Sequence, residues 1–200
     1  MNPFIGETER DLASAVAEWS GTLITRIPAA EKEGTLPRDV IAELGRLGVL
    51  GMTIPEADGG LGASAVAFAL VLEELSAAWP SLAVGVAVNS GIVAGSVVRN
   101  GSAEQRRRWL PKLMDGNGLG AFALTEPTSG SDAASLRTTA QVTEGGWRID
   151  GSKQFITNAR YAPFAIVLAR VGELDPERTS AGITAFVVPL DTPGVSIGRP

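Results

Sequence analysis

The sequence contains a loop whose hydroxyl groups could bind an anion or the polar edge of a ring. The loop follows a short apolar run, residues 121–124, and reads Thr125-Glu126-Pro127-Thr128-Ser129-Gly130-Ser131-Asp132. A loop of this kind can turn several backbone N–H groups toward one point, which suits a phosphate or an electron-rich ring edge. The hydroxyls of Thr125, Ser129 and Ser131 add donors without adding charge. A plain surface turn would have the same composition, so the loop by itself leaves both interpretations open.

A second segment further along the chain could form one wall of a site for a flat heterocycle. It reads Gly151-Ser152-Lys153-Gln154-Phe155-Ile156-Thr157-Asn158. We expect a strand over residues 153–157, after a turn at Asp150-Gly151. Residues two positions apart in a strand share a face, so Phe155 and Thr157 would place an aromatic plane beside a hydroxyl. The alternative is a strand that simply buries one ring.

Composition excludes several other kinds of chemistry. The 200-residue chain contains no cysteine and no histidine, which removes disulfides, thiolate zinc sites, Ser-His-Asp triads and most transition-metal sites. We therefore expect no metal site. The net charge of −5 argues against a nucleic-acid binder, which needs a basic face to neutralise phosphates.

The sequence predicts a cytoplasmic protein without a membrane segment. Its first residues lack a basic segment followed by an apolar one, so no secretory signal is expected. The longest apolar stretch, Leu82–Val98, is interrupted by Asn89 and Ser90 and flanked by amphipathic helices. This context favours a buried helix of a bundle over a membrane span.

The elements that must position the two segments change in type along the chain. Residues 1–118 predict helices near Glu7–Ala30, after Pro37, over Ala63–Ala78, and after a capping box that begins at Ser102 and is followed by Pro111. Residues 119–200 predict antiparallel β-structure, with a hairpin around Gly145-Gly146 and β-rich runs over 163–171 and 183–190. We therefore expect an α+β protein: an all-α helical domain over 1–118, then a β-domain over 119–200 that is incomplete at its C-terminal end.

Together the two segments resemble the flavin-binding motifs of the acyl-CoA dehydrogenase family. That family has a Thr-Glu-Pro core followed closely by Gly-Ser-Asp, and later Gly-x-Lys, an aromatic residue and Ile-Thr-Asn; both patterns occur here, at 125–132 and 151–158. Upstream, Ile54–Gly62 is similar to the family's Pro-Glu-x-x-Gly-Gly-x-Gly loop, and Gln105–Leu113 to the segment before its flavin strand. The resemblance implies an N-terminal helical domain, an antiparallel β-barrel-like middle domain and a C-terminal helical bundle. The last of these would lie outside the 200 residues.

The resemblance also implies roles for individual residues. FAD would be bound by Phe122, Leu124, Thr125, Gly130 and Ser131 of the first segment and by Phe155, Ile156 and Thr157 of the second. Thr125 would donate to the pyrimidine edge of the isoalloxazine, and Ser131 would sit where flavin and acyl-CoA substrate meet. Phe155 would cover a ring face, and Thr157 would donate toward the redox-active nitrogen. The chain departs from several relatives at Thr128-Ser129, where they have Gly-Ala, and at Phe155, where some have Trp.

The implied activity is the FAD-dependent α,β-dehydrogenation of an acyl-CoA thioester in fatty acid metabolism. An electron-transfer flavoprotein would accept the electrons, and a homotetramer or dimer is usual. In most members the catalytic base is a Glu of the C-terminal bundle, and no residue here matches it. The chain alone is therefore expected to be inactive and to bind FAD weakly or not at all. Two alternatives remain: a flavin monooxygenase or oxidase on the same fold, and a non-catalytic fragment or subunit.

Overall fold

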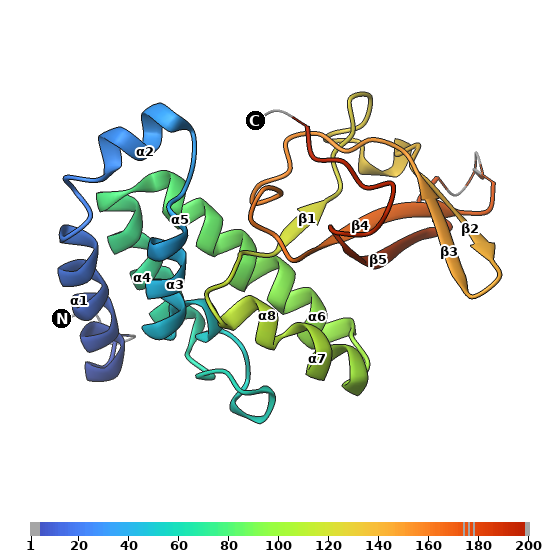
Figure 1. The fold of residues 1–200 in the computed structure, drawn as a ribbon. Coiled ribbons are helices and arrows are strands. Elements are labelled where there is room, and N and C mark those ends of the chain that lie inside the picture. Colours follow the sequence, from blue (N-terminus) through green and yellow to red (C-terminus); the bar gives the residue numbers. More distant parts are fainter. Residues whose placement is uncertain (1–4, 174, 176, 178, 199–200) are drawn as a thin grey trace. The chain divides into compact units, whose positions relative to one another are not determined.

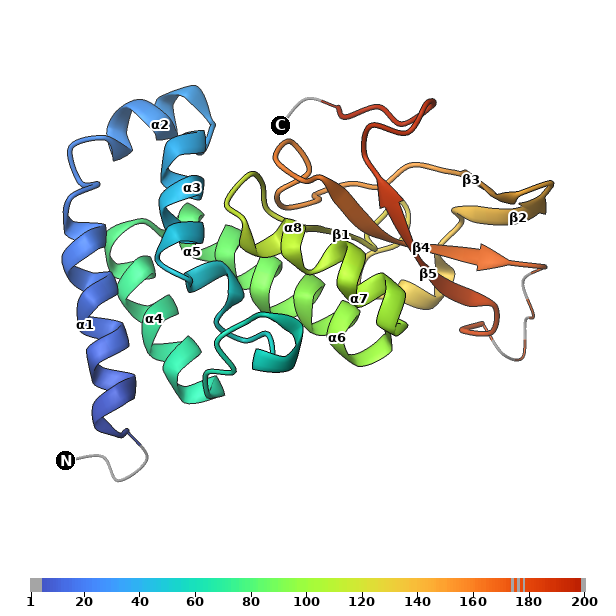
Figure 2. The same ribbon diagram turned by 60° about the horizontal axis from the view of Figure 1, so that its bottom comes forward.

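The chain folds into two compact units, one helical and one built on a β-sheet. A computed structural model describes residues 5–173, 175, 177 and 179–198. The helical unit extends to Gly120 and the β-unit covers Ala121–Ile197 (Figures 1 and 2). The ends of the two predicted domains, residues 1–4 and 199–200, lie outside the described range. The predicted succession of helices and then strands is confirmed.

The helical unit packs its helices around an apolar core. They are α1 (Glu7–Gly21), α2 (Ile27–Glu33), α3 (Arg38–Arg46), α4 (Ala65–Ala78), α5 (Pro80–Val86), α6 (Gly95–Asn100), α7 (Ala103–Trp109) and α8 (Pro111–Met114). The capping box at the start of α7 is present, since Gln105 N donates to Ser102 Oγ (3.2 Å) and Ser102 N donates to Gln105 Oε1 (2.8 Å). The single helix expected over 7–30 is instead two helices, because Pro28 cannot continue a helix from the preceding turn.

One continuous helical stretch, Pro80–Asn100, contains α5, a π-helical segment at Ala87–Ala94 and α6. The stretch is 21 residues long and contains an 18-residue window with a mean hydropathy of 1.8, which would allow it to cross a membrane by length and composition alone. This is a weak indication, since a helix buried in a protein core has the same properties. Here Leu82, Val86 and Val93 are fully buried in the helical unit, as expected of a core helix.

The sheet of the β-unit is organised around one long strand. Its strands are β1 (Ala121–Ala123), β2 (Thr139–Thr143), β3 (Gly146–Asp150), β4 (Phe164–Val171) and β5 (Ile183–Pro189). Strand β5 runs antiparallel along one edge of β4 from Phe164 to Arg170. On the other edge, β1 pairs in parallel with residues 165–167 and β2 pairs in parallel with residues 170–171. The sheet is therefore mixed and open, whereas antiparallel pairing was expected throughout.

The predicted hairpin is present, with a turn one residue earlier than expected. Thr143 pairs with Gly146, so Glu144 and Gly145 form the turn, and Gly145 has the positive φ (84°) that such a turn requires. The strand expected over 153–157 is wrong: residues 151–163 form loops throughout. Phe155 has a φ of 58°, which no strand residue adopts, and Asn158 has a φ of 68°.

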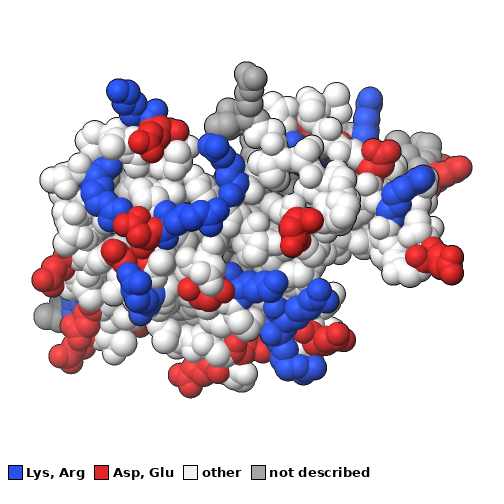
Figure 3. Space-filling view, in the orientation of Figure 1, with Lys and Arg blue, Asp and Glu red and all other residues white. Residues whose placement is uncertain are grey.

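Charged side chains of both signs are distributed over the surface (Figure 3). A group of basic residues lies on α7 and α8: Arg106, Arg107, Arg108 and Lys112. The guanidinium of Arg108 lies 4.7 Å from the Trp109 ring centroid, and the Lys112 ammonium lies 5.1 Å from it. These contacts cover the edge of the apolar core, as expected of a solvated helix face.

Candidate functional site

The first motif segment leaves the sheet and returns to the same edge of it. Strand β1 ends at Ala123 and β2 begins at Thr139, and both pair with the same edge of β4. The intervening residues 124–138 therefore form an excursion between two strands that lie end to end. Such a loop needs contacts of its own to keep one conformation, because no ladder of backbone hydrogen bonds crosses it.

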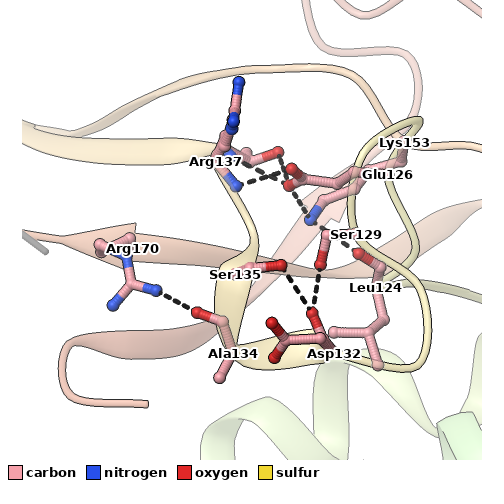
Figure 4. Close-up of polar contacts among 10 residues, drawn as sticks. Leu124, Glu126, Ser129, Asp132, Ala134, Ser135, Arg137, Lys153 and Arg170 are labelled. Atoms are coloured by element: carbon pink, nitrogen blue, oxygen red, sulfur yellow. Dashed lines mark hydrogen bonds and ion pairs between the residues drawn. The ribbon is translucent and has the colours of Figure 1, made fainter. Parts of the chain in front are cut away.

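The side chain of Glu126 supplies these contacts (Figure 4). Its carboxylate accepts hydrogen bonds from the backbone N–H groups of Arg137 (2.6 Å) and Thr138 (2.9 Å) and from the Thr138 hydroxyl (2.5 Å). Arg137 and Thr138 directly precede β2. One buried carboxylate therefore ties the start of the excursion to its end.

The same carboxylate connects the first motif segment to the second. Lys153 Nζ donates to Glu126 Oε1 at 2.8 Å and to the Leu124 carbonyl at 3.0 Å. The backbone N–H of Gln154 donates to the Thr125 carbonyl at 2.8 Å. The fold thus brings together two segments that are separate in the sequence, and the contacts fall on residues 124–126 and 153–154.

Burial and hydrogen bonding act in opposite directions on this ion pair. Burial of the Glu126 carboxyl favours its neutral form, but the donors from Lys153, Thr138 and Arg137 outweigh burial and lower its pKa to about 2. Burial lowers the pKa of Lys153, although Glu126 opposes that shift. The side chains are only 4% and 11% exposed, respectively. The pair is therefore charged at neutral pH, and its two charges neutralise each other.

The loop is also closed on itself within a few residues. Glu126 and Ser129 exchange two backbone hydrogen bonds, of 2.8 and 3.2 Å. The Ser129 hydroxyl is buried and donates to the Asp132 carbonyl at 2.7 Å. The expectation that Ser129 offers its hydroxyl to a ligand is therefore wrong. Its hydroxyl stabilises the loop, while Gly130 and Ser131 beside it are exposed.

Phe155 is the most unusual residue of the second segment. Its ring is 84% exposed although it is large and apolar, and its backbone is in the left-handed region. A bulky side chain rarely adopts this conformation, and such strain is found mainly at functional sites. Ile156, next to it, packs against the small core formed by Ala121, Ala123 and Ala165. Ile156 is therefore anchored in the core of the β-unit, while the neighbouring Phe155 ring is exposed.

The other predicted site residues lie in the same two segments. Phe122, Leu124, Thr125 and Thr157 are half-buried. The arrangement fits a flat polar cofactor, because it offers an exposed aromatic face and neutral hydroxyls, while the buried charges of Glu126 and Lys153 are mutually paired. Among the residues that the structure describes, no group of three or more acidic side chains could hold a metal ion.

Several positioning residues were not identified from the sequence. Thr138 and Arg137 hold the Glu126 carboxylate, and the buried side chain of Arg170 donates to the carbonyls of Ala134 (2.7 Å) and Ala181 (2.6 Å). Arg170 thereby braces the returning part of the excursion. A signal for the ion pair was available: Glu126 and Lys153 are isolated charges in segments that otherwise consist largely of neutral residues.

Comparison with known proteins gives consistent matches over both units. The family model "Acyl-CoA dehydrogenase, N-terminal domain" matches residues 6–117, and "Acyl-CoA dehydrogenase, middle domain" matches residues 121–200. The acyl-CoA dehydrogenase of Bacillus subtilis is 39% identical over 175 residues, which cover 86% of this chain and 45% of that protein. The human mitochondrial short-chain specific acyl-CoA dehydrogenase is 38% identical over 169 residues, covering 84% and 40%.

Solved structures agree with these matches. An acyl-CoA dehydrogenase from Geobacillus kaustophilus superposes with a TM-score of 0.91 at 31% identity, covering 97% of this chain and 51% of that one. A glutaryl-CoA dehydrogenase from Mycobacterium smegmatis in complex with FADH2 gives a TM-score of 0.86 at 37% identity, covering 95% and 47%. The chain thus spans about half the length of the relatives it matches.

Proposed function

This chain belongs to the acyl-CoA dehydrogenase family, and we propose that it supplies the helical and β portions of an FAD-dependent enzyme that dehydrogenates an acyl-CoA thioester. The observation that carries the proposal is the junction of the two motif segments. Lys153 and Gln154 hold residues 124–126, and the exposed, strained Phe155 follows directly. This junction is formed by residues 124–126 of the first motif and residues 153–154 of the second, so it supports reading the two motifs as parts of one site.

In this proposal the chain's own residues bind and orient the cofactor. FAD, when bound, supplies the acceptor for the hydride that leaves the β-carbon of the acyl group. The Thr125 and Thr157 hydroxyls donate to the ring edge, and Phe155 covers a ring face. Neutral donors already aimed at the ring stabilise the negative charge that the hydride brings, without reorganising. Ser131, which is exposed in the same loop, would contact the acyl-CoA.

Three further features of the enzyme belong to the same proposal. The carboxylate base that removes the α-proton would come from outside these 200 residues. Glu126 is unsuited to that role, because its carboxylate is buried and already accepts four hydrogen bonds. An electron-transfer flavoprotein would accept the electrons, and the enzyme would act as a homo-oligomer.

The test is flavin binding followed by reduction with substrate. The full-length polypeptide that carries this sequence is mixed with FAD, freed of unbound cofactor, and titrated without oxygen with acyl-CoAs of several lengths. We expect retained yellow colour that one class of acyl-CoA bleaches. Retained colour that no acyl-CoA bleaches, with rapid reaction of the reduced flavin with oxygen, would support an oxidase or monooxygenase instead.

A pair of variants tests the site itself. Phe155→Ala should weaken FAD binding about tenfold, because base–aromatic stacking of this kind contributes about 1–3 kcal/mol per ring. Trp147→Ala is the matched control: Trp147 is also an exposed aromatic of the β-unit, 47% exposed, but it lies in the β2–β3 hairpin, outside both motif segments. Equal effects of the two substitutions would contradict the assignment of the site.

A further inference from the structure

A buried polar residue, Asn89, interrupts the apolar helical stretch Pro80–Asn100. Asn89 is 0% exposed and lies in the π-helical segment Ala87–Ala94, between α5 and α6 (Figure 1). A buried amide is costly unless its donors and acceptors are bonded. An apolar residue would suit the helix itself better, so the bonds that Asn89 makes indicate why a polar side chain is present. π-Helical segments are rare and occur frequently at functional sites.

The side chain of Asn89 bonds to both ends of the connection that leads into the sheet. Its Nδ2 donates to the carbonyl of Leu113, in α8, at 3.1 Å. Its Oδ1 accepts from the N–H of Gly120 at 2.8 Å. Gly120 is the last residue before β1. One amide therefore fixes the point at which the chain leaves α8 and the point at which it enters the strand.

Packing fixes Gly120 in the same place. A Cβ atom on Gly120 would lie 2.7 Å from side-chain carbons of both Leu113 and Val93, so no side chain can be accommodated there. Gly120 is thus held by a hydrogen bond and by close contact on two sides. Its position depends on the π-helical segment, because Val93 and Asn89 both belong to it.

The element that follows is a short edge strand, whose further contacts are those of the small core around Ala121 and Ala123. β1 has only three residues, lies at the end of its sheet, and pairs with β4 alone among the described strands. Short edge strands open locally at low free-energy cost. Thr125 follows the end of β1 by two residues, so opening of β1 would displace the first motif segment.

We infer that Asn89 is a positioning residue for the cofactor: it anchors Gly120, keeps β1 closed and thereby holds residues 124–126 ready for the flavin. The consequence for FAD rests on the proposed function. The anchoring of Gly120 and β1 by Asn89 does not rest on the proposed function, and it can be measured without the cofactor.

The first experiment is site-resolved amide hydrogen exchange on the 200-residue chain without FAD. Asn89→Ala should speed exchange at Gly120 and through β1 by about tenfold, as expected when a buried hydrogen bond is lost. Asn89→Asp, with its carboxyl protonated, keeps an acceptor for the Gly120 N–H and a donor for the Leu113 carbonyl and should restore much of the protection. If Asn89→Ala fails to fold, Asn89→Leu replaces it, because leucine fills a similar volume but has neither the acceptor for Gly120 nor the donor for Leu113.

The matched control is Thr53→Val. The Thr53 hydroxyl donates to the carbonyl of Ser90, in the same π-helical segment, at 2.9 Å, and valine keeps its shape. This variant should lose a similar amount of thermal stability but leave exchange in β1 unchanged. The anchoring of β1 by Asn89 would be contradicted if amide exchange at Gly120 and in β1 were unchanged in Asn89→Ala, or if it changed equally in Asn89→Ala and Thr53→Val.

The second experiment measures FAD affinity of the same variants in the full-length polypeptide. Asn89→Ala should weaken binding about tenfold, Asn89→Asp less, and Thr53→Val not at all. A parent protein that binds no FAD would refute the proposed function, while the exchange data would still decide the anchoring. Unweakened FAD binding by Asn89→Ala, with exchange in β1 accelerated, would overturn the link to the cofactor.

Discussion

The contact between Glu126 and Lys153 determines, at the scale of single residues, how the two motif segments are joined. Lys153→Met would keep most of the side-chain volume but leave the buried Glu126 carboxylate without its cation. Removing one partner of a buried pair is strongly destabilising, and we expect a loss of about 3 kcal/mol in the free energy of unfolding. Denaturant unfolding with an unchanged m-value would measure it.

An exposed ion pair provides the control for this prediction. Arg26 and Asp39 approach to 2.6 Å, closer than Lys153 and Glu126, but the Asp39 side chain is 63% exposed. Asp39→Asn should change the free energy of unfolding far less than Lys153→Met does, because ion pairs at the surface contribute little to stability. A loss for Lys153→Met no larger than that for Asp39→Asn would show that the buried pair does not hold the segments together.

The same carboxyl predicts how stability depends on acid. The pKa of Glu126 is lowered from its ordinary 4.5 to about 2 in the folded chain, so the unfolded chain binds its proton first as pH falls. Its contribution is therefore fully present above about pH 4.5 and is lost as pH falls toward 2. The shift corresponds to roughly 3 kcal/mol. We expect the stability gap between the parent and Glu126→Gln to narrow over this window, measured by urea unfolding at successive pH values; a constant gap would contradict the assignment.

Single residues also show where the sequence was a poor guide. Ser129 and Ser131 have the same hydroxyl group, but the Ser129 hydroxyl donates to the Asp132 carbonyl within the loop, whereas Ser131 is exposed. The sequence alone does not distinguish these two environments. Pro127 at the second position favours the tight turn at 126–129, but it does not indicate that the Ser129 hydroxyl will donate to Asp132. The roles that the family resemblance assigns to the site residues stay predictions, because each role is defined by contacts with a bound cofactor or substrate.

At the scale of elements, Gly151 determines how closely the second segment approaches β2. A Cβ atom there would lie 2.8 Å from Thr138 Cα and closer still to the Thr138 hydroxyl oxygen. Gly151→Ala should therefore push Thr138 away from Glu126, and we expect a loss of roughly 1–3 kcal/mol in stability, as for overpacked cores. Thermal unfolding would measure it.

Gly146 provides the matched substitution for Gly151. It lies at the start of β3 in the adjoining hairpin, and a Cβ there would meet nothing within 4 Å. Gly146→Ala should be neutral or slightly stabilising, because alanine restricts the unfolded chain. Similar losses for the two alanine variants would show that close approach to Thr138 is not the cause.

Elements were predictable from the sequence where local patterns decide them. The capping box at Ser102 and the hairpin around Gly145 are formed by neighbouring residues, and both are present. The strand expected over 153–157 failed because tertiary contacts decide that segment: Lys153 and Gln154 bond to residues 124–126 in place of a neighbouring strand. The parallel pairing of β1 and β2 with β4 likewise depends on which edge each strand reaches, which alternation of residues does not encode.

At the scale of the whole molecule, net charge predicts how salt affects cofactor binding. The chain carries a net charge of −5, and the pyrophosphate of FAD is anionic. The two repel each other over a distance of about 30 Å at 0.01 M salt but only about 8 Å at 0.15 M. The donors assigned to FAD in this chain are neutral hydroxyl groups, so none of them contributes a positive charge that would offset this repulsion. FAD affinity of the 200-residue chain, which is expected to be weak and is therefore measured at high protein concentration, should stay constant or rise a few-fold with added salt.

Riboflavin and one surface variant distinguish this prediction from binding of the FAD pyrophosphate by basic residues. Riboflavin has the same ring system without phosphates, so its affinity should be insensitive to salt, and equilibrium dialysis would compare the two ligands. The alternative is that the basic residues of α7 contact the pyrophosphate, since Arg106, Arg107 and Arg108 are three consecutive basic residues. In that case FAD affinity would fall with salt, as for phosphate binders, and Arg107→Gln would weaken it at low salt. Affinity that is unaffected by Arg107→Gln and does not fall with salt would place cofactor recognition in the neutral donors of the two motif segments.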